Sequence, residues 1–479
     1  MSQILDKILE KPIFKEKDRA LIQKAFLTAE RAHQNQRRSS GEQYITHPLS
    51  VAHFLSELGL DSTTVAACLL HDTIEDTSLT HTDLEREFGK EIAFLVDGVT
   101  KLSKIEYSDS PQNEMSKSKS DKKIHTDRVP QEWAMPHSAH HLNSLKKMIF
   151  AMAEDIRVIL IKLADRYHNM ETLKHLNKTD QKRIALETME IYAPIAARLG
   201  MGRLKGQLED MAFPYVYPAE YSELMKKVKD KYRDVLNYID RTKPLIKRRL
   251  TDANIPIVDM HSRTKHYYSL YQKIKKPDKS LDKIYDLVAM RIIVPDIKSC
   301  YEALGIIHKY YKPLPGLIKD YIALPKPNGY QSLHTTIFCE KGKIVEIQIR
   351  TEDMHEFAEN GIAAHWAYGE SGKTKTARAN VKDIQWVTQL KNMLKELRPG
   401  EGLTNIKIDF FKHRIFAFTP KGEVKDLPDG ATPVDFAYAI HTDLGHMTRG
   451  AKINGKIVPL HCELKNGDVV EIMKGKDKK

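Results

Sequence analysis

The sequence predicts a multidomain protein with an all-α half, then an α/β domain built on a mixed sheet, then a small β-grasp-like module. A chain of 479 residues is too long for a single core. From residue 17 to about 200, apolar residues recur three and four apart, which is typical of amphipathic helices. From about 258 to 370 strand-like runs mix with helices, and residues 410–475 contain short strands joined by turns.

Composition describes a soluble globular protein. Hydrophobic residues make up 41% and charged residues 29% of the chain, and no apolar run approaches the roughly 20 residues of a membrane span. The N-terminus lacks the apolar block of a secretory signal, and the four cysteines have no metal-like spacing, so we expect a cytoplasmic protein with reduced thiols. The net charge of +12 favours polyanionic partners without separating nucleotides from nucleic acids.

In the helical half, the stretch LLHDTIEDT at 69–77 concentrates potential metal ligands. On a helix, positions four apart share a face, so His71 is expected over Glu75 and Asp72 over Asp76. Burying these groups after the apolar run VAACLL is costly without a compensating charge, which a metal ion would supply.

Two further polar residues lie on predicted helices of this half. His47 precedes a proline that can open a helix, and Asp165 belongs to the strongly apolar stretch IKLADRYHNMETL. Between them, residues 107–144 are rich in Ser, Lys, Asp and His and are expected to form a loop. The HSAHH run in that loop either binds a metal or, as is commoner for a polar tract, is solvated.

In the α/β domain, Asp286 stands near the start of a buried strand. In VEIQIRT the alternation places Glu346, Gln348 and Arg350 on one face of a strand. Two carboxylates on a rigid sheet suit Mg²⁺ and a polyphosphate. The alternative is that they pair with Arg291 and Arg350 as surface ions.

Basic and aromatic residues around these carboxylates favour a nucleotide site. Lysines neutralise phosphates and an aromatic face stacks on a base. No Walker-type glycine-rich loop is present, which excludes a P-loop enzyme. The residues form two groups: Lys265, Ser269 and Lys273 on one predicted helical stripe with Arg263 just before it, and then Lys319, Lys326, Tyr330 and His334.

The C-terminal module is predicted from its turns. Thr432 is expected to cap a helix whose first residue is Pro433, with Asp435 favouring the N-terminus. Asn454-Gly455, between two short apolar runs, is a strong hairpin signal.

The metal-ligand candidates resemble the His/His/Asp/Asp set of HD-domain phosphohydrolases, and the closest likeness is to the bifunctional RelA/SpoT homologues of the Rel type. The resemblance implies Mn²⁺ held by His47, His71, Asp72 and Asp165, with Glu75 and Asp76 orienting or deprotonating the attacking water. RRSSGEQYITHP also resembles the family's substrate stretch, which implies that Arg38, Ser40, Asn169 and Thr172 contact (p)ppGpp. Two features depart from the family: Ser39 stands where Lys is usual, and the 107–144 tract is unusually long.

The α/β domain resembles the Rel synthetase, a nucleotidyltransferase-like domain that transfers pyrophosphate from ATP to the 3′-hydroxyl of GDP or GTP. The resemblance implies Mg²⁺ at Asp286 and Glu346, with Glu346 also activating the 3′-hydroxyl. Tyr330 would stack on guanine and Arg263 would contact adenine, while the remaining residues of the two groups would serve phosphates or sugar. The motif Arg263-Thr264-Lys265-His266 is of the bifunctional type.

The last module resembles the TGS domain of long Rel proteins, which implies contacts with deacylated tRNA and the ribosome. His441 matches the position that contacts the tRNA end; the alternative is a structural histidine after a helix. Long family members continue beyond this module, so the chain is expected to be C-terminally short.

Together these observations predict a stringent-response enzyme that both synthesises and hydrolyses (p)ppGpp. The alternatives are a hydrolase or a synthetase whose other half is only a regulatory nucleotide-binding module, and a tRNA- or ribosome-binding regulator with vestigial catalysis. The expected segments are the HD hydrolase domain at 1–199, a helical linker at 200–257, the synthetase domain at 258–372, a helical connector at 373–405 and the TGS domain at 406–479.

Overall fold

The computed structural model describes residues 2–108, 151, 154–275, 284, 286–326, 328–339, 342–364, 414–428, 430–465 and 467–475. The chain divides into two compact units, Met1–Glu396 and Leu397–Lys479. The 107–144 tract beyond Ser108, with its HSAHH run, and the connector predicted at 373–405 lie outside the described residues.

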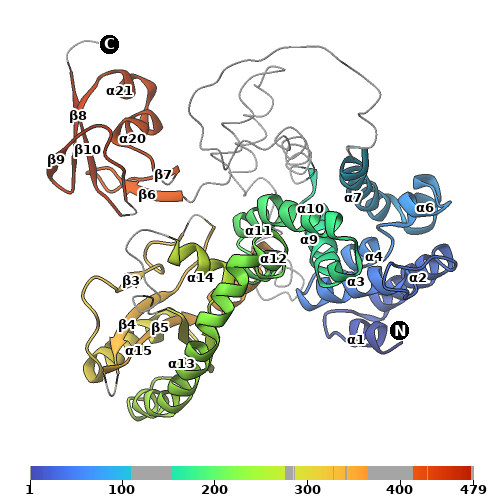
Figure 1. Ribbon diagram of the computed structural model, residues 1–479, viewed down its shortest axis with the longest axis horizontal. Coiled ribbons are helices and arrows are strands. Elements are labelled where there is room, and N and C mark those ends of the chain that lie inside the picture. Colours follow the sequence, from blue (N-terminus) through green and yellow to red (C-terminus); the bar gives the residue numbers. More distant parts are fainter. Residues whose placement is uncertain are drawn as a thin grey trace. The chain divides into compact units, whose positions relative to one another are not determined.

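The first unit opens with a helical half, which confirms the all-α prediction (Figure 1). Its helices bury one face: in α2 the buried apolar residues Ile22, Ala25, Phe26 and Ala29 are spaced by three or four. The helices are α1 (Ser2–Leu9), α2 (Glu16–Ala32), α3 (Thr46–Glu57), α4 (Ser62–Leu69), α5 (Thr73–Asp76), α6 (His81–Phe88), α7 (Lys90–Ser108), α9 (Ile156–Glu171), η3 (Leu173–His175), α10 (Lys178–Glu187), the π-helix η4 (Thr188–Tyr192), α11 (Ala193–Arg198), α12 (Gly202–Val216) and α13 (Pro218–Asp252).

The expectation of one continuous helix through LLHDTIEDT is wrong. The chain turns at residues 70–72, between α4 and α5. The Thr73 N–H bonds the Leu70 carbonyl at 3.0 Å and the Thr73 hydroxyl donates to the same carbonyl at 2.6 Å, so an i→i−3 turn replaces the α-helical pattern. The turn separates His71 and Asp72 from α5, which carries Glu75 and Asp76.

The α/β part of the first unit contains a five-stranded mixed sheet with the order β1-β2-β5-β4-β3, as predicted. Only β2 and β5 run parallel, with Ala289 opposite Glu346, and the other neighbours are antiparallel. The elements are β1 (Asp259–Thr264), α14 (Tyr267–Ile274), β2 (Val288–Val294), α15 (Ile297–Tyr310), β3 (Lys319–Asp320), β4 (Leu333–Phe338), β5 (Ile344–Thr351) and α16 (Glu352–Asn360).

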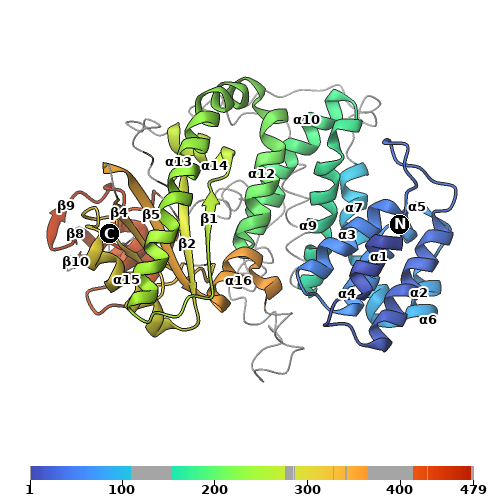
Figure 2. The same ribbon diagram turned by 90° about the horizontal axis from the view of Figure 1, so that it is seen from below.

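The two faces of β5 differ as the alternation predicts. Val345, Ile347 and Ile349 are buried in one core with residues of α13 and α15, which lie across the sheet in Figure 2. Arg350 points to the opposite face, where it pairs with Glu359 of α16. The polar face that carries Glu346 is therefore covered in part by a helix.

The second unit confirms the small β-grasp-like module. A hairpin of β6 (Arg414–Phe418) and β7 (Val424–Pro428) accompanies a three-stranded sheet of β8 (Thr448–Ile453), β9 (Lys456–Val458) and β10 (Val470–Lys474), with α20 (Pro433–Ile440) and α21 (Thr442–His446). Thr432 is the N-cap of α20, as predicted, and Asp435 accepts from its backbone N–H at 2.7 Å, so the two residues form a capping box. Asn454 and Gly455 have φ of 51° and 80°, as the predicted hairpin turn requires.

Among the described residues, no helix combines the length and the apolar character needed to span a bilayer.

Candidate active sites

The predicted metal ligands of the helical half come together from three elements. His47 in the first turn of α3, His71 in the turn after α4 and Asp165 on α9 are buried, and each offers a ligand atom within 4.8 Å of the others. Asp72 adjoins them, with its Oδ1 3.1 Å from His71 Nε2 and its Oδ2 3.7 Å from His47 Nε2. Residues separated by more than one hundred positions in the sequence thus form one cluster.

The hydrogen bond of His71 fixes the state of its imidazole. Nδ1 lies 2.7 Å from the carbonyl oxygen of Cys68, and because a carbonyl only accepts, Nδ1 carries the proton. In the neutral ring Nε2 then carries a lone pair. This buried atom faces Asp72 Oδ1 at 3.1 Å and makes no well-aligned hydrogen bond within the described part of the chain. A nitrogen prepared in this way fits a metal ligand.

His47 is prepared in the same way by a neighbouring histidine. Nδ1 of His168 lies 2.8 Å from both Arg38 and His47 Nδ1, and because a guanidinium only donates, this nitrogen is unprotonated. A proton on His47 Nδ1 avoids two opposed lone pairs, and the single lone pair of His168 serves one donor at a time. His47 Nε2 then faces Asp165 Oδ1 at 3.2 Å. Burial lowers the pKa of His47 and so favours the neutral ring, although Asp165 acts in the opposite direction.

Lone pairs and carboxylates therefore face one another across the cluster. Burial acts to raise the pKa of Asp165, but the charge on Lys162 holds it well below its usual range. Lys162 donates to Asp165 at 3.0 Å and Asn169 donates at 2.7 Å. A set of two imidazole nitrogens and two carboxylates is suited to a divalent transition metal.

Tyr44 is a member of this site that the sequence reasoning missed. Its hydroxyl lies 2.9 Å from Asp72 Oδ2 and 2.8 Å from Asp76 Oδ2, and its single proton serves one carboxylate at a time. Burial and the two negative charges raise the pKa of Tyr44, so it stays protonated. The signal was its place three residues before His47 in the quoted stretch GEQYITH.

The predicted substrate residues of the helical half divide into two groups. Arg38 donates to Asn169 Oδ1 at 2.9 Å, so both lie at the edge of the cluster. Ser40 instead donates to Glu42 at 3.3 Å, and Thr172 donates to the His168 carbonyl at the end of α9. Of the two proposed water-handling residues, Glu75 is half-buried and Asp76 is exposed.

In the α/β part, Asp286 pairs with both Lys265 and Lys273. Burial acts to raise the pKa of Asp286, but the two ammonium groups lower it to about 2. Burial acts to raise the pKa of Glu346, but the contacts with His334 and Gln348 lower it below its ordinary value, and the charge of Asp286 opposes that lowering. The two carboxylates are therefore within electrostatic reach of each other. The structure thus gathers the predicted metal carboxylates beside the predicted phosphate lysines.

The prediction that Lys265, Ser269 and Lys273 share one helical stripe is wrong for Lys265. This residue precedes α14, because its carbonyl accepts a hydrogen bond from Tyr232 at 2.6 Å and the helix begins only at Tyr267. Lys265 and Lys273 nevertheless meet at Asp286. Ser269 is half-buried on α14, and Arg263, expected just before the helix, lies on β1.

A hydrogen-bonded chain links the predicted base-stacking residue to Glu346. Tyr330 lies 2.8 Å from His334 Nε2, and His334 Nδ1 is 3.4 Å from Glu346. Burial lowers the pKa of His334, so with a neutral ring Tyr330 donates to Nε2 and Nδ1–H points to Glu346. Gln348 also donates to Glu346, at 2.8 Å.

Lysines border this chain. Lys326 lies over the ring of Tyr330 at 5.0 Å and over that of Tyr321 at 4.7 Å. Lys319, exposed on β3, stands opposite His334 in the register of the sheet. Tyr321 was not among the predicted site residues.

The alternative of simple surface ion pairs does not describe Asp286 and Glu346. Arg291 and Arg350 are buried, and both pair with Glu359 of α16, at 2.7 Å and 3.4 Å. This network was missed because Glu359 lies on a helix whose position against the sheet is not a local property of the sequence.

In the second unit, His441 is 69% exposed and caps α21 by accepting from the Asp443 N–H at 3.1 Å. His441 therefore acts as a structural histidine, which was the alternative to tRNA contact, and the rest of its ring is exposed.

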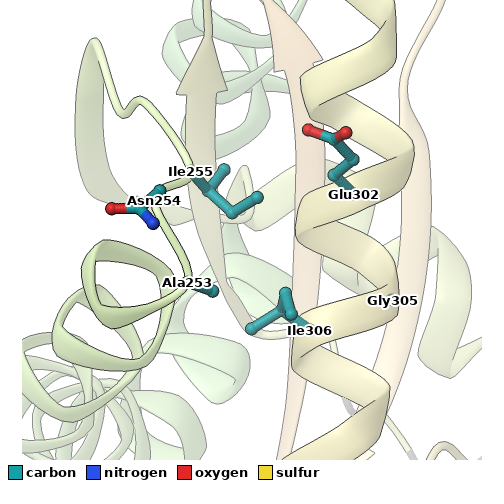
Figure 3. A pocket seen from close by; sticks show the side chains of 6 residues that line it. All are labelled: Ala253, Asn254, Ile255, Glu302, Gly305 and Ile306. Carbon is teal, nitrogen blue, oxygen red and sulfur yellow. The ribbon is translucent and has the colours of Figure 1, made fainter.

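A shallow hollow elsewhere on the first unit contains none of the predicted site residues (Figure 3). It lies between the end of α13 and α15 and is lined by Ala253, Asn254, Ile255, Glu302, Gly305 and Ile306.

Three family models match the chain in the order of its parts. The model described as an HD domain matches residues 25–202, the region found in RelA/SpoT proteins matches 262–373, and the TGS domain matches 415–474. A GTP pyrophosphokinase from Myxococcus xanthus is 48% identical over 95% of this chain and 57% of its own length. The bifunctional (p)ppGpp synthase/hydrolase SpoT from Escherichia coli K12 is 44% identical over 94% and 60%.

The chain thus spans a little over half the length of these curated relatives. Among solved structures, the small alarmone synthetase 2 from Bacillus subtilis is 26% identical over 36% of this chain and 93% of its own, with a TM-score of 0.25.

Proposed function

The chain belongs to the RelA/SpoT family, and we propose that it is a bifunctional enzyme that makes and destroys (p)ppGpp. The observation that carries the proposal is the pair of buried imidazoles whose Nε2 atoms face two carboxylates, in a chain that also has a second carboxylate site with lysines. We assign hydrolysis to the segment at 1–199 and synthesis to that at 258–372, joined by the linker at 200–257.

In the hydrolase, His47, His71, Asp72 and Asp165 would hold Mn²⁺, which their nitrogen and oxygen donors fit. When bound, the cation supplies Lewis-acid chemistry that polarises a phosphate and makes water more acidic. Glu75 and Asp76, the latter exposed beside the cluster, orient the attacking water, and one of the two carboxylates takes its proton.

The remaining polar groups of this site hold the catalytic ones in place. The Tyr44 hydroxyl steadies Asp72 and Asp76, and Asn169 ties Asp165 to Arg38. Arg38 contacts the guanine nucleotide, and Ser40 and Thr172 complete the contacts to the substrate after exchanging their local hydrogen bonds. The products are GDP or GTP and pyrophosphate.

In the synthetase, Asp286 and Glu346 would hold Mg²⁺, which supplies charge neutralisation at the transferred phosphates. Glu346 accepts the proton of the 3′-hydroxyl, and the hydrogen bonds from His334 and Gln348 orient its carboxylate. The 3′-oxygen of the guanine nucleotide then forms the new bond to phosphorus of the transferred pyrophosphate group. AMP leaves with the electrons of the bond that breaks in ATP.

The other residues of this site bind the two nucleotides. Tyr330 stacks on guanine and Arg263 contacts adenine, while the surrounding cations neutralise phosphates. These cations are Lys265, Lys273, Lys319 and Lys326, with Ser269 and His334 serving the sugar or phosphates.

For the TGS module, proposed to extend from 406 to 479, we propose contact with deacylated tRNA and the ribosome. The exposure of His441, whose ring edge is free of the protein interior, supports it. We further propose that the protein acts in the cytoplasm, where its nucleotide substrates are found.

Two assays on the intact chain test the central proposal. With Mn²⁺ and ppGpp, pyrophosphate and GDP should form; with Mg²⁺, ATP and GDP, AMP and ppGpp should form. Absence of either reaction would reduce the protein to a hydrolase or a synthetase with a regulatory half, and absence of both would contradict the proposal.

A further inference from the structure

Helix α12 joins the two parts of the first unit. It contacts α9, α10 and α11 of the helical half and α14 and α16 of the α/β part (Figure 2). Gly202, Gly206 and Asp210 are spaced by four along α12, so they form one stripe, and all three meet groups of the α/β part.

The two glycines of this stripe permit close approach. A Cβ atom at Gly202 would lie 3.0 Å from the Ala358 carbonyl oxygen of α16. A Cβ atom at Gly206 would lie 2.2 Å from the ring of His266, so any side chain there displaces that imidazole. The distance between α12 and the start of α14 is thus set by the absence of a side chain.

Asp210, the third residue of the stripe, lies on α12 and caps the N-terminus of another helix, α14. Its Oδ2 accepts from His266 Nδ1 at 2.8 Å, and its Oδ1 accepts from the Tyr268 N–H at 2.9 Å. His266, at the N-cap position of α14, makes no side-chain capping bond itself. A carboxylate there satisfies an unpaired N–H and complements the helix dipole.

The segment fixed in this way leads directly to the lysines of the synthetase site. The Lys265 N–H bonds the carbonyl of Leu287, next to Asp286, at 3.0 Å, and Tyr232 holds the Lys265 carbonyl. Lys265 precedes the capped turn and Lys273 lies in the last turn of the same helix, and both reach Asp286.

We propose that Asp210 is a positioning residue of the synthetase. Together with Gly206 it fixes His266 and the first turn of α14, so that Lys265 and Lys273 converge on Asp286. Asp210 touches no nucleotide in this account and acts through the helix. The inference rests on the proposed synthetase function and adds a residue from the linker to it.

The test compares Asp210→Ala and Gly206→Ala with two matched controls in the intact chain. Asp230→Ala removes an exposed aspartate of α13 that pairs with Arg233 on the surface of its own helix. Gly305→Ala adds a methyl group to another helical glycine, where nothing lies within 4 Å. Helix propensity favours both glycine substitutions equally, so a difference between them reports the contact with His266.

Both test variants should lower kcat for ppGpp synthesis by about 10- to 100-fold, because small displacements of catalytic groups are costly. KM for GDP should change little, since Tyr330 lies on another segment, and ppGpp hydrolysis should be retained. Asp210→Asn, which keeps an acceptor for the Tyr268 N–H, should be intermediate. Adding His266→Ala to Asp210→Ala should cost less than the sum of the two single effects.

The outcomes separate this inference from the proposed function. If wild type synthesises ppGpp and Asp286→Ala does not, yet Asp210→Ala and Gly206→Ala match their controls, the positioning role is overturned and the function stands. Parallel loss of hydrolysis would show a general structural role and would also overturn it. If wild type makes no ppGpp, the proposed synthetase itself fails.

Discussion

At the scale of single residues, the state of two imidazoles decides what the helical site can bind. The Nδ1 proton of His71 goes to the Cys68 carbonyl and that of His47 goes to His168, so both Nε2 atoms face the carboxylates. His168 is thus a partner that keeps His47 in the metal-binding tautomer. Sequence spacing revealed which residues could be ligands, but no sequence pattern shows a tautomer.

We expect His71→Ala to lose both bound Mn²⁺ and ppGpp hydrolysis, because it removes a buried nitrogen that faces the carboxylate of Asp72 in the proposed ligand set. Metal content per chain, measured by atomic emission after dialysis against Mn²⁺, checks this independently of activity. His81→Ala, which changes an exposed histidine of α6, is the control. Full metal content in His71→Ala would argue against the proposed ligand set.

Tyr44→Phe should slow hydrolysis by about 10- to 100-fold, the range typical of lost partners of metal ligands. The substitution keeps the ring, which stacks on His33, and removes only the hydroxyl between Asp72 and Asp76. Hydrolysis rates of the two proteins at saturating Mn²⁺ measure the effect, with ppGpp synthesis as the control. Equal hydrolysis rates would mean that the hydroxyl has no part in catalysis.

Glu359→Gln should destabilise the α/β part by about 1–3 kcal/mol near neutral pH, because the buried Arg291 and Arg350 lose the charge of their shared, partly buried carboxylate. Burial acts to raise the pKa of Glu359, but the two arginines hold it below its ordinary value. The ionised Glu359 carboxylate therefore stabilises the fold fully at any pH above its ordinary pKa. This stabilisation is lost as the pH falls through the lowered pKa of the folded protein.

Urea unfolding of wild type and Glu359→Gln across acid and neutral pH tests this sign. The difference in the free energy of unfolding should shrink toward acid pH. A difference that stays constant, or grows toward acid pH, would show that the carboxylate charge is not what stabilises the network.

At the scale of elements, the local signals were reliable where local bonds decide. The N-cap at Thr432 and the Asn454-Gly455 turn were predicted from a few neighbouring residues and are confirmed. The start of α14 was misplaced because Asp210 of α12 and Tyr232 of α13 fix it from a distance.

Thr432→Ala should raise hydrogen exchange in α20 by an amount equivalent to about 1 kcal/mol, because the N-cap residue loses the hydroxyl that bonds Asp435 in the first turn. Exchange measured on the whole chain should rise at α20 and the strands packed against it, β7, β8 and β10, and remain unchanged in α3 and α9. Exchange at wild-type rates in α20 would show that the capping box contributes nothing there.

At the scale of the whole molecule, the change from helical to strand-like hydrophobic periodicity along the sequence predicted the order of the three parts. Composition and periodicity could not predict that Asp165 joins His47 and His71, since helix packing brings them together; the family resemblance supplied that link. The placement of α12 between the proposed hydrolase and synthetase was likewise beyond local patterns.

The most direct test of the account measures both reactions in wild type, Asp165→Ala and Asp286→Ala. Wild type should hydrolyse and synthesise ppGpp, Asp165→Ala should only synthesise, and Asp286→Ala should only hydrolyse. A single substitution that abolished both reactions, or one that left its assigned reaction intact, would contradict two separate active sites on one chain.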